Sequence, residues 1–253
     1  MIKVFQIYFD KISEQALEPG FEPFKNESED DYFESAVMKE IYEMNPSSKD
    51  EFKYIGITSW KQRLKTRLTS SEILEHIQKD IDSGKEKDVY IYSPLQGVDI
   101  SQGKDGFLHG IIRHSDIWDG HFHRNVQIEK DNQLLNNSGA LPFNIFDGKW
   151  QYCKCNYWIA KREVFDEYCK TVLLPALKFY ECPDVKASMP KWYRHSHTGN
   201  KYNSCLFTLE GLFGSFLAHS NYSFEYIANK KHSGKFQRII IDGYERMESV
   251  SIK

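Results

Sequence analysis

The chain has 253 residues, of which 40% are hydrophobic and 27% are charged, the balance of a globular protein that can bury a large core. Its 33 basic and 36 acidic residues give a net charge of −3 rather than the basic excess of a nucleic-acid-binding protein, so we expect no nucleic-acid partner. No run of about 18 apolar residues predicts a membrane-spanning helix, and Met1–Phe5 lacks the pattern of a signal peptide. We therefore expect a cytoplasmic protein with at most peripheral contact with a membrane.

The first 95 residues alternate between buried strands and amphipathic helices. The strand segments are rich in β-branched and aromatic residues, and the helical segments repeat apolar residues every three or four positions. This order is typical of a mostly parallel sheet flanked by helices. We expect strands at 3–9, 52–57 and 88–92 and a helix at 32–44. A second helix is expected after Ser70 or Ser71, either of which can cap it, and Gly84 ends it.

The carboxyl ends of these strands define a candidate binding edge. Ligands of open α/β sheets collect at that edge, because the loops that follow parallel strands meet there. Polar residues follow each predicted strand. They lie at Tyr8–Asp10, Thr58–Lys61 and Ser93–Pro94.

The second half of the chain is less regular. We expect loops with short helical pieces over 95–148, a strand at 152–160, and a helix at 161–180 that Pro175 kinks or restarts. A polar loop at 183–203, a helix at 207–217 and a short strand at 224–228 follow. We interpret residues 1–253 as one domain. It divides into a nucleotide-binding half (1–95), an acceptor-side half (96–235) and a tail without an assigned role (236–253).

The segment after the second strand carries the strongest chemical signal. Its hydroxyl and cationic side chains suit a diphosphate, because charge-assisted hydrogen bonds to phosphate are strong. The alternative is a solvated basic turn. The residues concerned are Thr58, Ser59, Lys61, Arg63 and Lys65.

Two families resemble parts of this chain. Tyr54–Gly56, with Thr58 and Arg63, resembles the second motif of GIY-YIG nucleases. The nearest candidate for the first motif, Gln6–Tyr8, lies tens of residues upstream with a helix between and has no glycine, so the hairpin of those nucleases cannot form. The order and spacing of four segments resemble bacterial exopolysaccharide and capsule glycosyltransferases of an originally uncharacterised family. These segments are Tyr54–Arg63, Asp88–Pro94, Asn156–Cys169 and Phe207–Phe213. The chain departs from that family at Thr58–Lys61, where a His-Tyr-Arg-Arg run is common.

The second resemblance implies a GT-A-like fold and a glycosyltransferase of the hexosyltransferase class. Its donor would be a nucleotide-sugar, and its acceptor a glycan or a lipid-linked sugar in surface polysaccharide synthesis. The predicted donor-binding residues are Tyr8, Thr58, Ser59, Lys61, Arg63, Lys65, Asp88 and Ser93. The predicted acceptor-binding residues are Asn156, Trp158, Trp192 and His195.

Glu210 is the predicted catalytic base. It interrupts an otherwise apolar helix, where a carboxylate must be paired or have a raised pKa, unless it faces solvent on the polar side of the helix. An inverting transferase needs such a carboxylate to take the proton of the acceptor hydroxyl, whereas a retaining one does not.

Metal dependence stays open at this point. No Asp-x-Asp pair ends a strand, where a Mn²⁺ or Mg²⁺ ion would be expected, but Asp99, Asp116 and Asp119 in the loop that follows could bind such an ion. The alternative is a metal-free site that relies on Lys61, Arg63 and Lys65. The pairs His121–His123 and Cys153–Cys155 are weaker candidates for a transition metal. A non-catalytic sugar- or nucleotide-binding module and, less favoured, a GIY-YIG-like nuclease are the alternative functions.

Overall fold

The computed structural model of the chain describes the following residues: 1–27, 32–44, 52–92, 122–147, 149, 151, 153, 155–189, 191–194, 201–203, 205–227, 236–241 and 244–249. The side chains of 122–128, 191–194, 201, 202 and the last two ranges are not among them. Within these ranges, no helix combines the length and the apolar character needed to cross a membrane.

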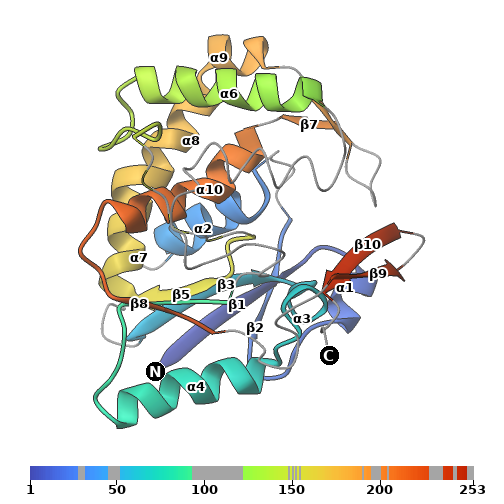
Figure 1. The fold of residues 1–253 in the computed structure, drawn as a ribbon, viewed down its shortest axis with the longest axis vertical. Helices are drawn as coiled ribbons and strands as arrows, with labels where there is room; N and C mark the ends of the chain where they lie inside the picture. The colour runs from blue at the N-terminus through green and yellow to red at the C-terminus, as the bar shows by residue number, and fades with distance from the viewer. Residues whose placement is uncertain are drawn as a thin grey trace.

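A six-stranded sheet forms the centre of the molecule (Figure 1). β1 pairs in parallel with β2 and β3, and β4 pairs in parallel with β8, whereas β5 runs antiparallel to both of its neighbours. The prediction of a mostly parallel sheet is therefore confirmed. In spatial order the strands are β2 (Glu22–Lys25), β1 (Ile2–Tyr8), β3 (Tyr54–Ser59), β5 (Trp158–Lys161), β4 (Val89–Ile91) and β8 (Phe224–Tyr226).

Helices cover both faces of this sheet (Figure 1). One face packs against α4 (Ser70–Asp82), whose Ile73 and Ile77 are fully buried. The other face packs against α2 (Phe33–Met44), α10 (Cys205–Ala218) and α7 (Arg162–Tyr168). The predicted architecture of a sheet flanked by helices is thus confirmed, with a separate apolar core on each face.

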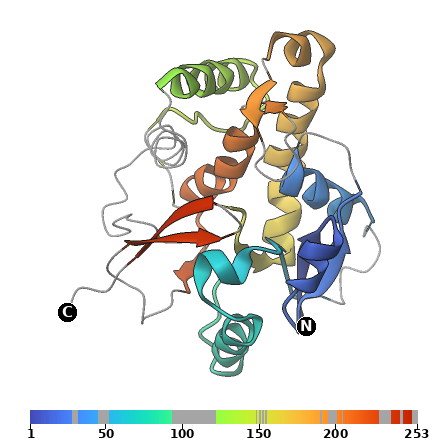
Figure 2. The ribbon, with the colours of Figure 1, turned by 90° about the vertical axis from the view of Figure 1, so that its right-hand side faces the viewer.

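A further layer lies beyond α10. The helix α6 (Phe122–Asn137) packs on α10. In Figures 1 and 2, α6 and α4 lie at opposite ends of the molecule. The sequence predicted only loops and short helical pieces here, and α6 shows little apolar periodicity.

One long helical segment follows β5, as the sequence predicts. It consists of α7, a π-helical turn η2 (Cys169–Leu173) and α8 (Leu174–Glu181). The π-turn lies directly before Pro175, which occupies the first turn of α8. The missing amide of proline is tolerated there, because the i→i−4 ladder is already interrupted.

The remaining elements are short. They are α1 (Lys11–Gln15), α3 (Gln62–Thr66), α9 (Pro183–Ser188), the pair β6 (Lys191–Arg194) and β7 (Lys201–Asn203), and the pair β9 (Phe236–Ile241) and β10 (Tyr244–Ser249).

The pairing of β1 with β3 contradicts the nuclease alternative. Gln6 lies opposite Thr58 in a parallel pair, and β2 and α2 separate the two strands along the chain. A GIY-YIG nuclease needs these two motifs in a short hairpin, whose strands are antiparallel.

Candidate functional site

The carboxyl ends of β1, β3 and β4 lie at one edge of the sheet. β1 and β3 are parallel, and β4 points the same way because both β3 and β4 run antiparallel to the intervening β5. α3 leaves β3 at this edge and carries Lys65, with Lys61 directly before it. The predicted convergence of Tyr8–Asp10 and Thr58–Lys61 is confirmed, whereas Ser93 lies outside the described residues.

Lys65 is the centre of the site. Its Nζ donates to Cys155 Sγ at 3.3 Å and lies 5.4 Å from the centroid of the Tyr157 ring. Burial lowers the pKa of Lys65, but the neighbouring Cys155, Tyr157, Glu34 and Glu210 raise it by more, so the ammonium stays charged. We call Glu34, Lys65, Cys155, Tyr157 and Glu210 the Lys65 cluster.

Glu210 joins this cluster from α10. Its Oε1 accepts a hydrogen bond of 2.6 Å from the backbone amide of Cys155. The side chain therefore does not simply face solvent on the polar side of the helix. Lys65 and Glu210, which come from distant parts of the chain, therefore both contact Cys155.

The backbone amide that donates a hydrogen bond to Glu210 belongs to an unusual turn. Cys155 and Asn156 have φ values of 62° and 52°, the left-handed conformation that side chains other than glycine rarely adopt. The carboxylate of Glu210 stabilises this turn, which leads directly into β5.

Glu34 also belongs to the cluster, although its sequence context does not mark it as a site residue. It lies in the first turn of α2 and is partly buried. Burial raises the pKa of Glu34; Lys65 and Lys61 lower it and Glu210 raises it further, and the net direction is upward. The sequence contains no pattern that connects this acidic residue to a turn about 120 residues away, because only tertiary packing brings them together.

Hydroxyl groups line the neighbouring part of the edge. Ser59 Oγ and Tyr157 OH share a hydrogen bond, and the Tyr157 ring stacks on Tyr92 with centroids 5.8 Å apart. Burial raises the pKa of Tyr157, so its phenol stays protonated at neutral pH. Thr58 is fully buried beside them. Of these residues, only Ser59 is partly exposed. Its hydroxyl is therefore the one that can hydrogen-bond a ligand at this edge.

Two of the predicted donor cations differ in their surroundings. Lys61 Nζ lies 4.8 Å from the centroid of the Trp60 ring and is partly exposed. Arg63 Nη1 lies 3.2 Å from Oε1 of the buried Glu18, so part of its charge is already neutralised.

Asp88 does not belong to the site. It precedes β4, at the edge of the sheet opposite to the Lys65 cluster, and it binds Lys161 Nζ at 2.8 Å and Ser223 Oγ at 2.7 Å. Its predicted role in donor binding is corrected to a structural one, because a residue that opens a strand lies away from the carboxyl edge.

Trp158 is also corrected. Its side chain is only 1% exposed and stacks on Phe213, with ring centroids 3.7 Å apart and planes inclined by 3°. It is a core residue that joins β5 to α10 and has no surface for an acceptor.

The other predicted acceptor residues are described to different extents. Asn156 is 3% exposed and lies in the left-handed turn beside Glu210. Trp192 lies in β6, where the side chain is not described, and His195 lies outside the described residues, as does His121. Cys153 and Cys155 are both buried free cysteines.

No protein-family model and no curated protein matches the sequence. Among solved structures, the fold is similar to the apo structure of WbbM, a bifunctional glycosyltransferase, with a TM-score of 0.42 and 12% sequence identity. The similarity covers 90% of this chain and 45% of that chain, so this chain spans less than half the length of that protein.

Proposed function

We propose that this protein is a glycosyltransferase that moves a sugar from a nucleotide-sugar to a glycan or lipid-linked acceptor. The observation that carries the proposal is the meeting of the basic turn after β3 with Glu210 of α10 around Cys155. This juxtaposition combines cations and a carboxylate at the carboxyl edge of the sheet, where α/β proteins bind nucleotides. The order and spacing of four chain segments resemble those of capsule glycosyltransferases, which supports the proposed sugar transfer.

The proposed chemistry needs opposite charges at two places. Negative charge grows on the departing nucleoside diphosphate, and Lys61 and Lys65 would stabilise it by charge-assisted hydrogen bonds. The acceptor hydroxyl must lose its proton, which Glu210 would take as general base. The raised pKa of Glu34, caused first by burial, makes this residue a second candidate for the proton transfer.

Ligand binding is the first test of the proposal. A panel of nucleoside diphosphates, each with and without Mn²⁺, is measured by thermal shift; we expect at least one to raise Tm in a saturable manner, because ligands of the folded state stabilise it. Lys61→Ala should weaken its Kd about tenfold, since one charge-assisted hydrogen bond is lost. Lys79→Ala, on the exposed face of α4, is the matched control and should leave Kd unchanged. No saturable shift with any nucleotide would refute the proposal.

The catalytic carboxylate is tested by two substitutions at one position. Glu210→Gln keeps an oxygen that accepts the Cys155 amide but loses the charge, so we expect unchanged nucleotide affinity and a loss of transfer of about 10²–10⁴-fold. Glu210→Ala also removes the hydrogen bond and should lower the free energy of unfolding by roughly 1–3 kcal/mol. Full activity of Glu210→Gln combined with inactive Glu34→Gln would assign the base to Glu34.

Donor transfer and hydrolysis assays of the wild-type protein distinguish a transferase from a non-catalytic binding module. A binding module binds the nucleotide but neither transfers nor hydrolyses the sugar of any donor tested, whereas a transferase shows at least slow donor hydrolysis.

A further inference from the structure

We propose that a divalent transition-metal ion, with Zn²⁺ as the ion of choice, binds between α4 and β8 at His76, Asp80 and Glu225. These three residues share no member with the Lys65 cluster, and the inference does not depend on the proposed function. Their potential ligand atoms all lie within 4.8 Å of one another.

The backbone places these three side chains together. His76 and Asp80 are four residues apart on α4, so they lie one helical turn apart on the same side. Glu225 is aligned with Tyr90 in the parallel pair of β4 and β8, and the Tyr90 ring packs edge-on against His76 at 6.1 Å. Both elements are regular, so the positions of the three ligands are fixed by the fold.

The distances suit a small ion. His76 Nε2 lies 3.0 Å from Glu225 Oε1 and 3.8 Å from Asp80 Oδ2. Ligands of a tetrahedral zinc ion at about 2.0–2.1 Å lie roughly 3.3 Å apart, so small side-chain rotations bring all three to bonding distance. Water can supply a fourth ligand, because the three side chains are between 17% and 37% exposed.

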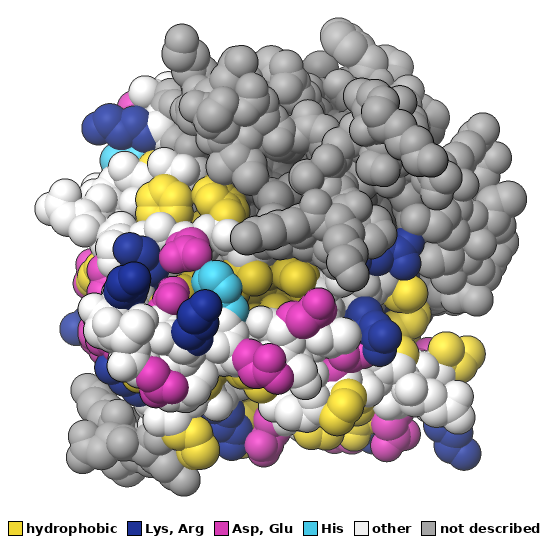
Figure 3. All heavy atoms as spheres, turned by 60° about the horizontal axis from the view of Figure 1, so that its bottom comes forward, with side chains coloured by type: hydrophobic (Ala, Val, Ile, Leu, Met, Phe, Trp, Pro, Cys, Tyr) yellow, Lys and Arg dark blue, Asp and Glu magenta, His cyan; other side chains and the backbone are white. Residues whose placement is uncertain are grey.

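The local charge also favours a cation. Two carboxylates face one imidazole, and within the described ranges no lysine or arginine forms an ion pair with Asp80 or Glu225. The hydroxyl of the buried Tyr90 donates to Asp80 Oδ2 at 3.1 Å and accepts from the Lys87 amide, and this hydrogen bond orients the carboxylate. Figure 3 shows the face that includes α4, where acidic, basic and histidine side chains are interspersed.

The ligand set selects the class of ion. An imidazole nitrogen with two carboxylates suits a borderline ion such as Zn²⁺, whereas Ca²⁺ and Mg²⁺ prefer oxygen ligands and a larger coordination number. The ion would connect the helix on one face of the sheet to the edge strand β8, a structural role.

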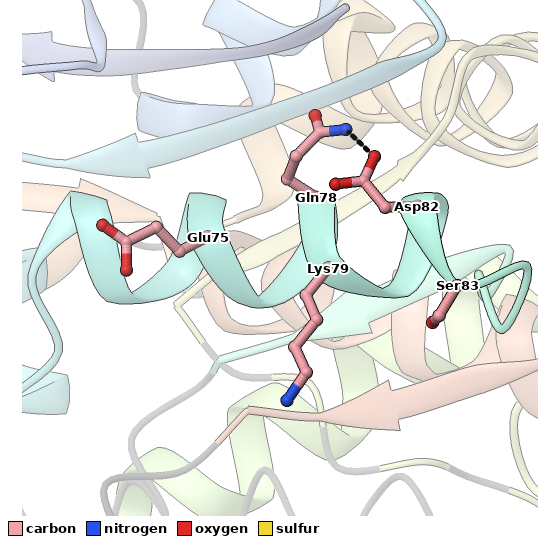
Figure 4. Close-up of a pocket in the computed structure, with 5 residues that line it drawn as sticks. All are labelled: Glu75, Gln78, Lys79, Asp82 and Ser83. Atoms are coloured by element: carbon pink, nitrogen blue, oxygen red, sulfur yellow. Dashed lines mark hydrogen bonds between the residues drawn. The ribbon is translucent and has the colours of Figure 1, made fainter.

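Calorimetric titration of the full chain with zinc chloride tests the site. We expect one saturable site and a rise in Tm, and we expect His76→Ala and Glu225→Gln each to weaken Kd at least tenfold. Glu75→Gln is the matched control, because Glu75 lies on the same helix but lines a hollow of about 420 Å³ on its solvent side (Figure 4). Its Kd should equal that of the wild type.

The absorption spectrum of the Co²⁺ form provides a second readout, which separates this site from the cysteines. We expect d–d bands without a thiolate charge-transfer band, and their loss in His76→Ala. The inference is overturned if zinc does not bind saturably, if His76→Ala binds as tightly as the wild type, or if a thiolate band appears. Circular dichroism of each variant verifies that it is folded.

Discussion

Cys155 and Asn156 form the most unusual backbone of the site. Two consecutive residues other than glycine adopt left-handed φ values, which costs free energy that the surroundings must offset. The carboxylate of Glu210 accepts the Cys155 amide, and Lys65 donates to the Cys155 thiol. The two residues that the sequence selected for chemistry thus also hold this turn, so the turn and the cluster form together.

The pKa of Glu34 makes a testable contribution to stability. Burial raises this pKa above the ordinary value of 4.5, so the folded state binds the proton more tightly than the unfolded state does. The stabilising contribution is fully present below about pH 4.5 and is lost as the pH rises through the folded pKa. Glu34→Gln stays neutral at both pH values. The difference in Tm between this variant and the wild type should therefore be shifted in favour of the variant at pH 7.5 relative to pH 4. Thermal melts of both proteins at the two pH values measure this difference, and an equal difference would contradict the prediction.

Gly56 allows β3 and β5 to approach closely. A Cβ atom at this position would lie 2.6 Å from Ile159 Cγ1 and 2.8 Å from the Trp158 carbonyl oxygen. We expect Gly56→Ala to lower the free energy of unfolding by about 1–3 kcal/mol, because backbone atoms must move. Urea denaturation measures the effect. Gly139→Ala is the comparison: its φ of 71° is strained, but no atom lies within 4 Å, so its cost should be about 1 kcal/mol.

At the level of elements, α4 begins with a complete capping box. Thr69 Oγ1 accepts from the Glu72 amide at 3.2 Å, and Glu72 Oε2 accepts from the Thr69 amide at 2.7 Å. From the sequence we expected this cap one or two residues later, at Ser70 or Ser71. Thr69→Ala should destabilise the protein by roughly 0.5–2 kcal/mol, whereas Thr69→Ser should be nearly neutral. A lower Tm for Thr69→Ser than for Thr69→Ala would contradict the role of Thr69 as the N-cap of α4.

Elements with a strong internal pattern were predictable, and elements defined by contacts were not. The periodic helices α2 and α4, the helical segment from α7 to α8, the apolar helix α10 and the strands β1, β3 and β4 lie within a few residues of their predicted positions. The edge strand β2 has the sequence Glu-Pro-Phe-Lys, which resembles a loop, and it becomes a strand only because β1 pairs with it. The insertion of β5 between β3 and β4 likewise depends on tertiary pairing.

The same distinction applies to the candidate site. Lys61, Lys65 and Glu210 were recognisable because charged residues stand out at a strand end or in an apolar helix. Glu34 and Tyr157 look ordinary in the sequence, since their importance arises from the burial and the neighbours that the folded chain provides. Trp158 was misassigned because an aromatic residue that fills a core looks the same in the sequence as one that binds a sugar.

At the level of the whole molecule, the two apolar cores share one sheet. Tyr54 of β3 belongs to the core beneath α4, and Ile55 of the same strand belongs to the core beneath α2 and α10. Loss of either core exposes the strands that support the other. We therefore expect one cooperative transition, in which tryptophan fluorescence and far-ultraviolet circular dichroism give the same midpoint in urea. Two separated midpoints would show that the cores unfold independently.

The two outer strands of the sheet are short. β8 has three residues, and β2 has four, of which Pro23 has no amide hydrogen to donate and Glu22 and Lys25 are charged. An incoming strand from a second copy would find few free amides and carbonyls to extend the hydrogen-bonded ladder. Such borders discourage edge-to-edge pairing between two copies of the sheet.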